Sequence, residues 1–362
     1  RVELRHSQST KLATSATGIT VTGEVAASQD YPNYRPRVDW NFTAVKKLDP
    51  RLSYQRTGPA SYVDEYGIVK IVAYNEPRFD HDPMTGECKG LLIEPGRTNN
   101  NKCVLNQWEF TGWTDSRFNR EHYPSETAPD ESTNATLVYP NTDNDSHYIY
   151  VSHAGNGLTG SRTCSAWFKK LSTTTYFPQL RIFGAGSGKA HAVFTLTGDG
   201  SVTSGGNATT NATITRYPND WYYCTLSWTY NSGHWGGGIV IGNDSSTELP
   251  TFAGNADKTK GFLVWGFQDE AGAFPTSLVV TDGITRTRGV DLAYLDGTTG
   301  TEFDDIYDPE QGTFVINWFN NPNGNHNDGY VFTVDDGTGN NRIGAVNSNN
   351  YQVSVVDSGS SQ

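Results

Sequence analysis

The chain has 362 residues, of which 39 are acidic and 27 basic, giving a formal net charge of −12. This balance argues against a nucleic-acid-binding surface, which needs clustered Lys and Arg, and no apolar run reaches the roughly 18 residues of a membrane-spanning helix. Gly, Tyr, Phe and Trp are frequent, and no long segment has apolar residues at helical spacing. The composition therefore predicts an all-β protein of two or three domains.

Residues 1–27 predict three short strands, because apolar and polar residues alternate and turn-forming residues interrupt the pattern twice. Three strands of this size cannot bury a core by themselves. We therefore expect the segment to pack against other domains or against other copies of the chain. The apolar positions expected at that interface are Val2, Leu4, Leu12, Ile19 and Val21.

Residues 28–104 predict a linker followed by a small β connector. Pro and Arg are frequent up to about residue 60, and the later runs GIVKIVAY and GLLIE predict two strands. Between them lies FDHDPMTGE, in which Asp80 and Asp82 could open a calcium loop. The glycine and the bidentate glutamate do not fall where such a loop needs them. We therefore expect a structural turn over Asp82–Gly86 and no metal ion.

Residues 105–290 carry the clearest sandwich pattern. Short, aromatic-rich runs such as HYIYVSH, RTCSAWFKK, WYYCTLSWTY and GFLVWGFQDE recur with turn signals between them, which predicts two packed sheets. Trp167, Trp221 and Trp265 lie in alternating strand patterns and are expected in the core. Residues 291–362 predict the beginning of a second β-sandwich, because new strand-like runs follow Gly312 and the sequence ends after too few of them.

The sequence predicts no catalytic residues, no cofactor and no metal. Its eight histidines form no closely spaced pair, and neither a nucleophile elbow nor a P-loop is present. The four cysteines lack metal-ligand spacing and are expected to be buried thiols or one disulfide pair. Because the chain begins at Arg1 and its only methionine is Met84, we expect it to be part of a longer polypeptide.

Glycan binding requires an exposed aromatic plane for the C–H face of a sugar, with polar groups beside it for the hydroxyls. Three stretches offer this combination: NQWEFTGWTD, DNDSHYIY and NSGHWGGG. Burial in the core is the alternative for each tryptophan. Trp235 is the least core-like, since three glycines follow it in an expected loop tip. The candidate glycan-binding residues are Trp108, Trp113, His147, Tyr148, His234 and Trp235.

Several stretches also resemble parts of phage proteins. VELRHSQSTKLATSATGITVTG resembles the short β-repeat of tail fibres in marine and cyanobacterial tailed phages, and YVDEYGIVKIVAYNEPRFDHDPMTGECKGLLIEPGRTN resembles a module of phage tail and other virion proteins. The span 108–288, with SAWFKK and DWYYCTLSWTY, resembles the jelly rolls of carbohydrate-binding modules in such proteins. From Gly312 onward the chain resembles the opening of a concanavalin- or laminin-G-like domain.

This resemblance implies a non-enzymatic tail fibre or receptor-binding protein on the virion, which contacts other tail proteins and a host surface glycan and acts outside the cell. It also implies a homotrimer with residues 1–27 around a threefold axis. Two alternatives remain open. One is a depolymerase tailspike that hydrolyses host polysaccharide, with its catalytic part beyond Gln362 or between subunits. The other is a capsid-decorating or adaptor protein that binds no ligand.

Overall fold

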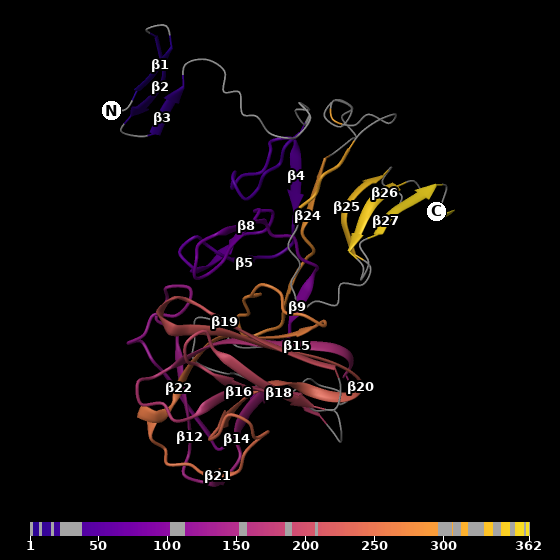
Figure 1. Cartoon of the computed structure of the whole chain (residues 1–362). Coiled ribbons are helices and arrows are strands. Elements are labelled where there is room, and N and C mark those ends of the chain that lie inside the picture. The colour runs from indigo at the N-terminus through magenta and orange to yellow at the C-terminus, as the bar shows by residue number, and fades with distance from the viewer. Residues whose placement is uncertain are drawn as a thin grey trace. The chain divides into compact units, whose positions relative to one another are not determined.

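The computed structural model describes most of the chain, and the described residues form an all-β protein, as predicted from composition (Figure 1). Helical backbone in the described part is limited to single turns at Pro218–Asp220 and Lys258–Lys260. The chain divides into two compact units, Arg1–Asp39 and Trp40–Gln362. The described residues are 3–6, 9–15, 18–21, 38–101, 113–151, 158–184, 190–206, 209–295, 306, 313–317, 329–335, 342–347, 352–357 and 360–361.

The first unit contains one antiparallel sheet, and its strands confirm the three short strands predicted within residues 1–27. They are β1 (Glu3–His6), β2 (Ser9–Ser15) and β3 (Gly18–Val21). Leu4 is opposite Leu12, and Leu12 is opposite Val21. Directly opposed positions share a face, as do positions two apart on one strand, which adds Ile19. Four of the five expected interface positions therefore share one face of the sheet, while Val2 lies outside the described residues.

The largest part of the second unit is a two-layer sandwich, and one long strand runs through both of its layers. Its strands are β10 (Trp113–Ser116), β11 (Phe118–His122), β12 (Thr136–Pro140), β14 (His147–Val151), β15 (Leu158–Lys170), β16 (Phe177–Gly184), β17 (Ala190–Thr195), β18 (Ser201–Gly206), β19 (Thr209–Arg216), β20 (Trp221–Gly242) and β22 (Phe262–Ala271). The first half of β20 pairs with β15 and β19, and its second half pairs with β14 and β16. A short ladder joins β13 (Asn144–Asp145) and β21 (Phe252–Ala253).

The apolar side chains of the sandwich form two clusters, one between its layers and one on the outer face of a layer. Between the layers, the ring of Phe168 on β15 lies 6.2 Å from that of Phe194 on β17. Successive residues of a strand point to opposite faces, so Trp167 points away from this core into a second cluster. Trp221 and Trp265 belong to the same second cluster. The prediction that these three tryptophans are core residues is confirmed.

The connector is built from chain segments that precede the sandwich in sequence and from segments that follow it. Its strands are β4 (Leu52–Gln55), β5 (Ala60–Val63), β6 (Val69–Val72), β7 (Phe79–His81), β8 (Cys88–Leu91), β9 (Arg97–Asn99), β23 (Arg286–Arg288) and β24 (Leu292–Leu295). β9 pairs with β22 and β23. β4 and β24 form a two-stranded antiparallel ribbon in which Leu52 is opposite Leu295 (Figure 1). The chain therefore enters this region and leaves it at neighbouring positions.

The turn predicted after Asp82 is confirmed. The Gly86 N–H donates to the Asp82 carbonyl over 2.9 Å, and Gly86 has a φ of +70°, a conformation that favours glycine. The Asp82 carboxylate accepts the N–H groups of Met84 and Thr85 within the same turn. Asp80 accepts the Val63 N–H over 2.8 Å instead, and burial raises the pKa of its carboxyl group.

The C-terminal described strands form a four-stranded antiparallel sheet, and the second sandwich expected here stays a prediction. They are β25 (Gly329–Asp335), β26 (Arg342–Asn347), β27 (Gln352–Asp357) and β28 (Ser360–Ser361). None of the described segments is a helix that is long and apolar enough to cross a membrane.

The three described cysteines are free thiols. Cys164 and Cys224 are buried free thiols and Cys88 is a half-buried free thiol, in keeping with the first of the two expectations for cysteine.

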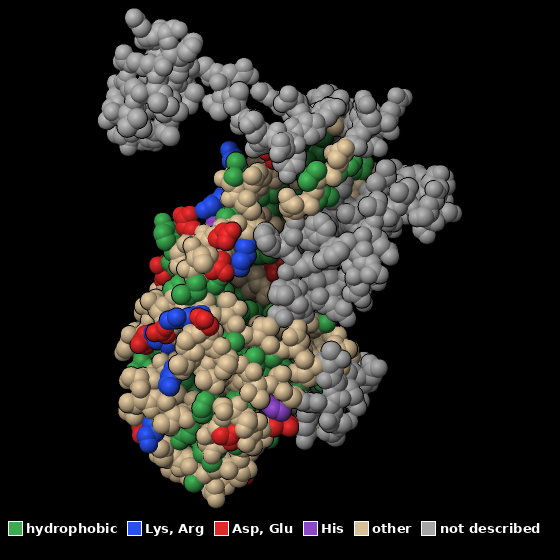
Figure 2. All heavy atoms as spheres, viewed as in Figure 1, with side chains coloured by type: hydrophobic (Ala, Val, Ile, Leu, Met, Phe, Trp, Pro, Cys, Tyr) green, Lys and Arg blue, Asp and Glu red, His purple; other side chains and the backbone are tan. Residues whose placement is uncertain are grey.

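On the face drawn in Figure 2, basic and acidic side chains of the described residues are interspersed, and no continuous basic field appears there.

Candidate functional site

An aromatic surface lies on the outer side of the sandwich layer that contains β14, β20 and β16. The burial of β14 alternates: His147, Ile149 and Val151 are buried, whereas Tyr148 and Tyr150 between them are half-buried. The ring of Tyr150 stacks on that of Phe183 from β16, with centroids 4.9 Å apart and planes 26° apart. Tyr148 lies 5.2 Å from the same Phe183 ring. Two half-buried tyrosine rings therefore pack on the buried ring of Phe183, which lies beneath them.

Glycine on the strand between them allows these rings to meet. β20 separates β14 from β16, and Gly238 is opposite both Tyr150 and Arg181 in the register. A Cβ at Gly238 would lie 2.6 Å from the Cβ of Tyr150 and 2.2 Å from the Ile149 carbonyl oxygen. Because real Cβ atoms do not approach so closely, only glycine leaves room for the rings to close over β20.

Charged side chains border the rings. Arg181 Nη1 lies 2.6 Å from Glu248 Oε1, and its guanidinium lies 5.2 Å from the centre of the Phe183 ring. His191 Nδ1 lies 3.8 Å from Glu248 Oε2. Burial lowers the pKa of His191, and the charge of Arg181 acts in the same direction, against that of Glu248. The Glu248 side chain is 39% exposed, so its carboxylate is available as an acceptor. We call Tyr148, Tyr150, Phe183, Arg181 and Glu248 the aromatic face.

Of the six residues expected to bind glycan, two are structural in this fold. His147 is fully buried, and its ring nitrogens lie 2.7 Å from the Arg117 carbonyl oxygen and 3.2 Å from the Phe252 carbonyl oxygen. It belongs to the interior because it alternates with Tyr148 on the strand. Trp113 is half-buried and packs edge-on against Phe267, with centroids 4.7 Å apart. Neither ring is presented as an open plane.

The other candidates divide differently. Tyr148 is part of the aromatic face, whereas Trp108 lies outside the described residues. The loop tip expected at Trp235 is wrong, since the backbone of His234 and Trp235 lies inside β20. The following glycines marked a close approach of strands rather than a loop. Gly184, at the end of β16, is opposite His234, so this backbone is adjacent to the aromatic face in the sheet.

Sequence reasoning missed four members of the aromatic face: Tyr150, Phe183, Arg181 and Glu248. The alternation in HYIYV carried the signal for Tyr150, because any strand that exposes Tyr148 exposes Tyr150 on the same side. No comparable signal marked Glu248, which the loop after β20 brings to Arg181. Within the described part of the chain, no group of three or more His, Cys, Asp or Glu side chains could hold a metal ion.

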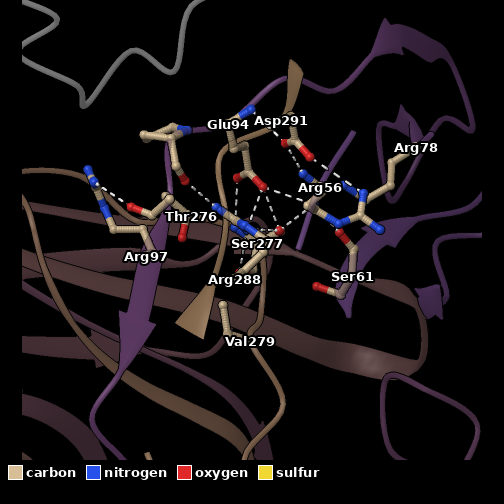
Figure 3. A network of polar contacts seen from close by, with 12 residues as sticks. Arg56, Ser61, Arg78, Glu94, Arg97, Thr276, Ser277, Val279, Arg288 and Asp291 are labelled. Atoms are coloured by element: carbon tan, nitrogen blue, oxygen red, sulfur yellow. Dashed lines mark hydrogen bonds and ion pairs between the residues drawn. The ribbon is translucent and has the colours of Figure 1, made fainter. Parts of the chain in front are cut away.

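A second concentration of polar groups lies in the connector, where buried ion pairs join segments from before and after the sandwich (Figure 3). Arg78 Nη2 lies 2.5 Å from Asp291 Oδ2, and Arg78 Nη1 lies 2.9 Å from Glu94 Oε2. Arg288 Nη1 lies 2.7 Å from that same Glu94 oxygen. Arg56 Nη1 lies 3.4 Å from Asp291 Oδ1. The side chains of the three arginines and of Asp291 are fully buried, so this cluster is closed to ligands and holds the connector together.

The pKa of Glu94 reflects these partners. Burial by itself would raise it, but the guanidinium groups of Arg288 and Arg78 and two hydrogen bonds from Ser277 outweigh burial and hold the pKa below its ordinary value. The ionised carboxylate is therefore the form that the folded connector requires.

We expect the protein to lose stability in acid partly through Glu94. Its folded-state pKa is depressed, so its contribution is present above the unfolded value of about 4.3 and is lost as the pH falls through the folded pKa. Urea unfolding midpoints measured from pH 7 to pH 3 should therefore fall less steeply for Glu94→Gln than for the wild type. Glu131→Gln, which removes an exposed carboxylate paired with Lys70, is the control. Identical pH dependences for E94Q and the wild type would contradict this assignment.

No protein-family model matches the chain, and no curated protein matches it at a significant level.

Proposed function

We propose that this chain is a host-attachment protein of a tailed phage, a tail fibre or related virion appendage, and that its sandwich binds a host surface glycan at the aromatic face. The observation that carries the binding role is the grouping of two half-buried tyrosine rings on the buried ring of Phe183, beside an exposed carboxylate. Rings of this kind cover the C–H face of a sugar, while Glu248 accepts hydrogen bonds from hydroxyls. The virion setting is supported by the sequence resemblance to fibre repeats and tail modules.

The proposed assembly is a homotrimer that docks to other tail proteins. Its support is the shared apolar face of β1, β2 and β3, which three strands alone cannot cover. Three copies would present three aromatic faces at once, and weak single-site binding would then add up to firm attachment. No cofactor or metal enters this proposal.

The binding role is tested by Tyr150→Ala. Loss of one stacked ring should weaken binding of the isolated protein to host surface polysaccharide by about 2- to 10-fold, corresponding to about 0.5–1.5 kcal/mol for an aromatic contact. Binding would be measured by surface plasmon resonance on immobilised polysaccharide, with the thermal midpoint recorded alongside. Tyr139→Ala, at a half-buried tyrosine packed on the second cluster, is the matched control.

Three results would count against the proposal. A stably folded Y150A protein with wild-type binding would remove the aromatic face from recognition. Wild-type protein that binds no host polysaccharide would remove the attachment role. Release of reducing sugar by the wild type would replace the adhesin with a depolymerase.

A further inference from the structure

A small pocket opens on the sandwich at a place separate from the aromatic face. It has a volume of about 110 Å³ and is lined by the segment between β15 and β16 and by the end of β17. Phe194 and Pro178 are buried in its wall, and Phe177 is half-buried beside them. An enclosed cavity of about 150 Å³ accommodates benzene, so this pocket admits a substituent or one edge of a sugar ring rather than a whole ring.

The rim of the pocket carries one unbalanced positive charge. Lys170 is exposed and forms no ion pair within the described part of the chain. The neighbouring lysines are balanced: Lys169 pairs with Glu126 over 2.7 Å, and Lys258 pairs with Glu121 over 3.1 Å. In a protein with a net charge of −12, a free ammonium group at a pocket is a local exception.

Threonine hydroxyls line the same pocket as Lys170. The side chains of Thr175 and Thr197 are exposed at the pocket, and their hydroxyls have no hydrogen-bond partner among the described residues. Thr174 differs, because its hydroxyl already donates to the Gly261 carbonyl and accepts the Leu171 N–H. An ammonium group with two free hydroxyls matches the lone pairs of a carboxylate, and the apolar wall matches C–H groups next to it.

We infer that this pocket binds the carboxylate of an acidic sugar, such as a uronic acid unit. The site is distinct from the aromatic face, and the inference does not depend on glycan binding there. The ammonium of Lys170 supplies the counter-charge, Thr175 and Thr197 donate hydrogen bonds, and the sugar edge contacts the ring of Phe177.

In the test, the full chain is titrated separately with glucuronate, glucose and acetate, and binding is measured by isothermal titration calorimetry. Glucuronate should bind with an affinity on the order of millimolar, and glucose and acetate should bind at least about tenfold more weakly. Lys170→Gln should weaken glucuronate binding by about tenfold or more, since a hydrogen-bonded charge is lost. Lys47→Gln removes an exposed lysine charge from the connector and should leave binding unchanged.

Glucuronate binding that is equal in K170Q and the wild type would overturn the inference, as would glucose that binds as tightly as glucuronate. Acetate that binds as tightly as glucuronate would overturn the inference that the pocket recognises the sugar as well as the carboxylate. Absence of glucuronate binding to the wild type would overturn the site altogether. The two proposals fail separately, because Y150A should keep glucuronate binding and K170Q should keep binding at the aromatic face.

Discussion

Replacing Asp291 with alanine should lower the free energy of unfolding by about 3–5 kcal/mol, the usual cost of breaking a buried ion pair from one side. The variant leaves Arg78 and Arg56 buried without their shared carboxylate, and it also removes acceptors for the Tyr54 hydroxyl and the Glu94 N–H. Water cannot replace the lost carboxylate at the two guanidinium groups, because the side chains of Arg78 and Arg56 are fully buried. Urea denaturation followed by tryptophan fluorescence measures the change.

The matched control for Asp291 is Asp282→Ala. Asp282 also pairs with an arginine, Arg286, but the two side chains are 55% and 48% exposed. Solvent and salt screen such a pair, so the expected loss is about 0–1 kcal/mol. Equal stabilities for the two variants would show that the buried network is not what secures the connector, whereas failure of D291A alone to fold would agree with it.

A charge at Leu12 should convert a trimer into monomers. Leu12 is the central position of the apolar row, opposite Leu4 on one side and Val21 on the other. In a threefold assembly, Leu12→Glu would place three carboxylates close together against apolar surface, and their desolvation would not be compensated. Light scattering of the full chain should give three times the monomer mass for the wild type and the monomer mass for L12E.

The adjacent residue provides the control for this experiment. Ala13 follows Leu12 on β2 and therefore belongs to the other face, opposite Glu3 and Thr20. Ala13→Glu adds the same charge one position away and should leave the trimer intact. A wild-type protein that is monomeric, or an A13E variant that dissociates as completely as L12E, would refute the proposed interface.

Features that depend on neighbours in the sequence could be predicted. The turn at Asp82–Gly86 is held by its own backbone hydrogen bonds and by the Asp82 side chain, so a few residues contain all the information. The core positions of Trp167 and Trp265 followed from alternation along single strands. Alternation alone did not reveal that these rings fill a second cluster outside the two layers, since that depends on which segments cover the face.

Features that depend on distant residues could not be predicted. Asp291 meets Arg56 across 235 positions and Arg78 across 213, and no local pattern selects those partners. At the aromatic face, Tyr148 could be found because it follows a polar turn and lies in an obvious strand. The glycines after Trp235 misled the interpretation, since glycine favours loops and also permits strands to approach closely.

The ribbon of β4 and β24 has a mechanical consequence. Because Leu52 faces Leu295 at its end, tension between the chain before residue 52 and the chain after residue 295 acts first on that one rung. The residue pairs of the ladder would separate one after another from that end, until the tension acts on the ion pair between Arg56 and Asp291. A pull on these two chain segments would thus spare the sandwich, whose strands bear no force while the buried ion pairs hold.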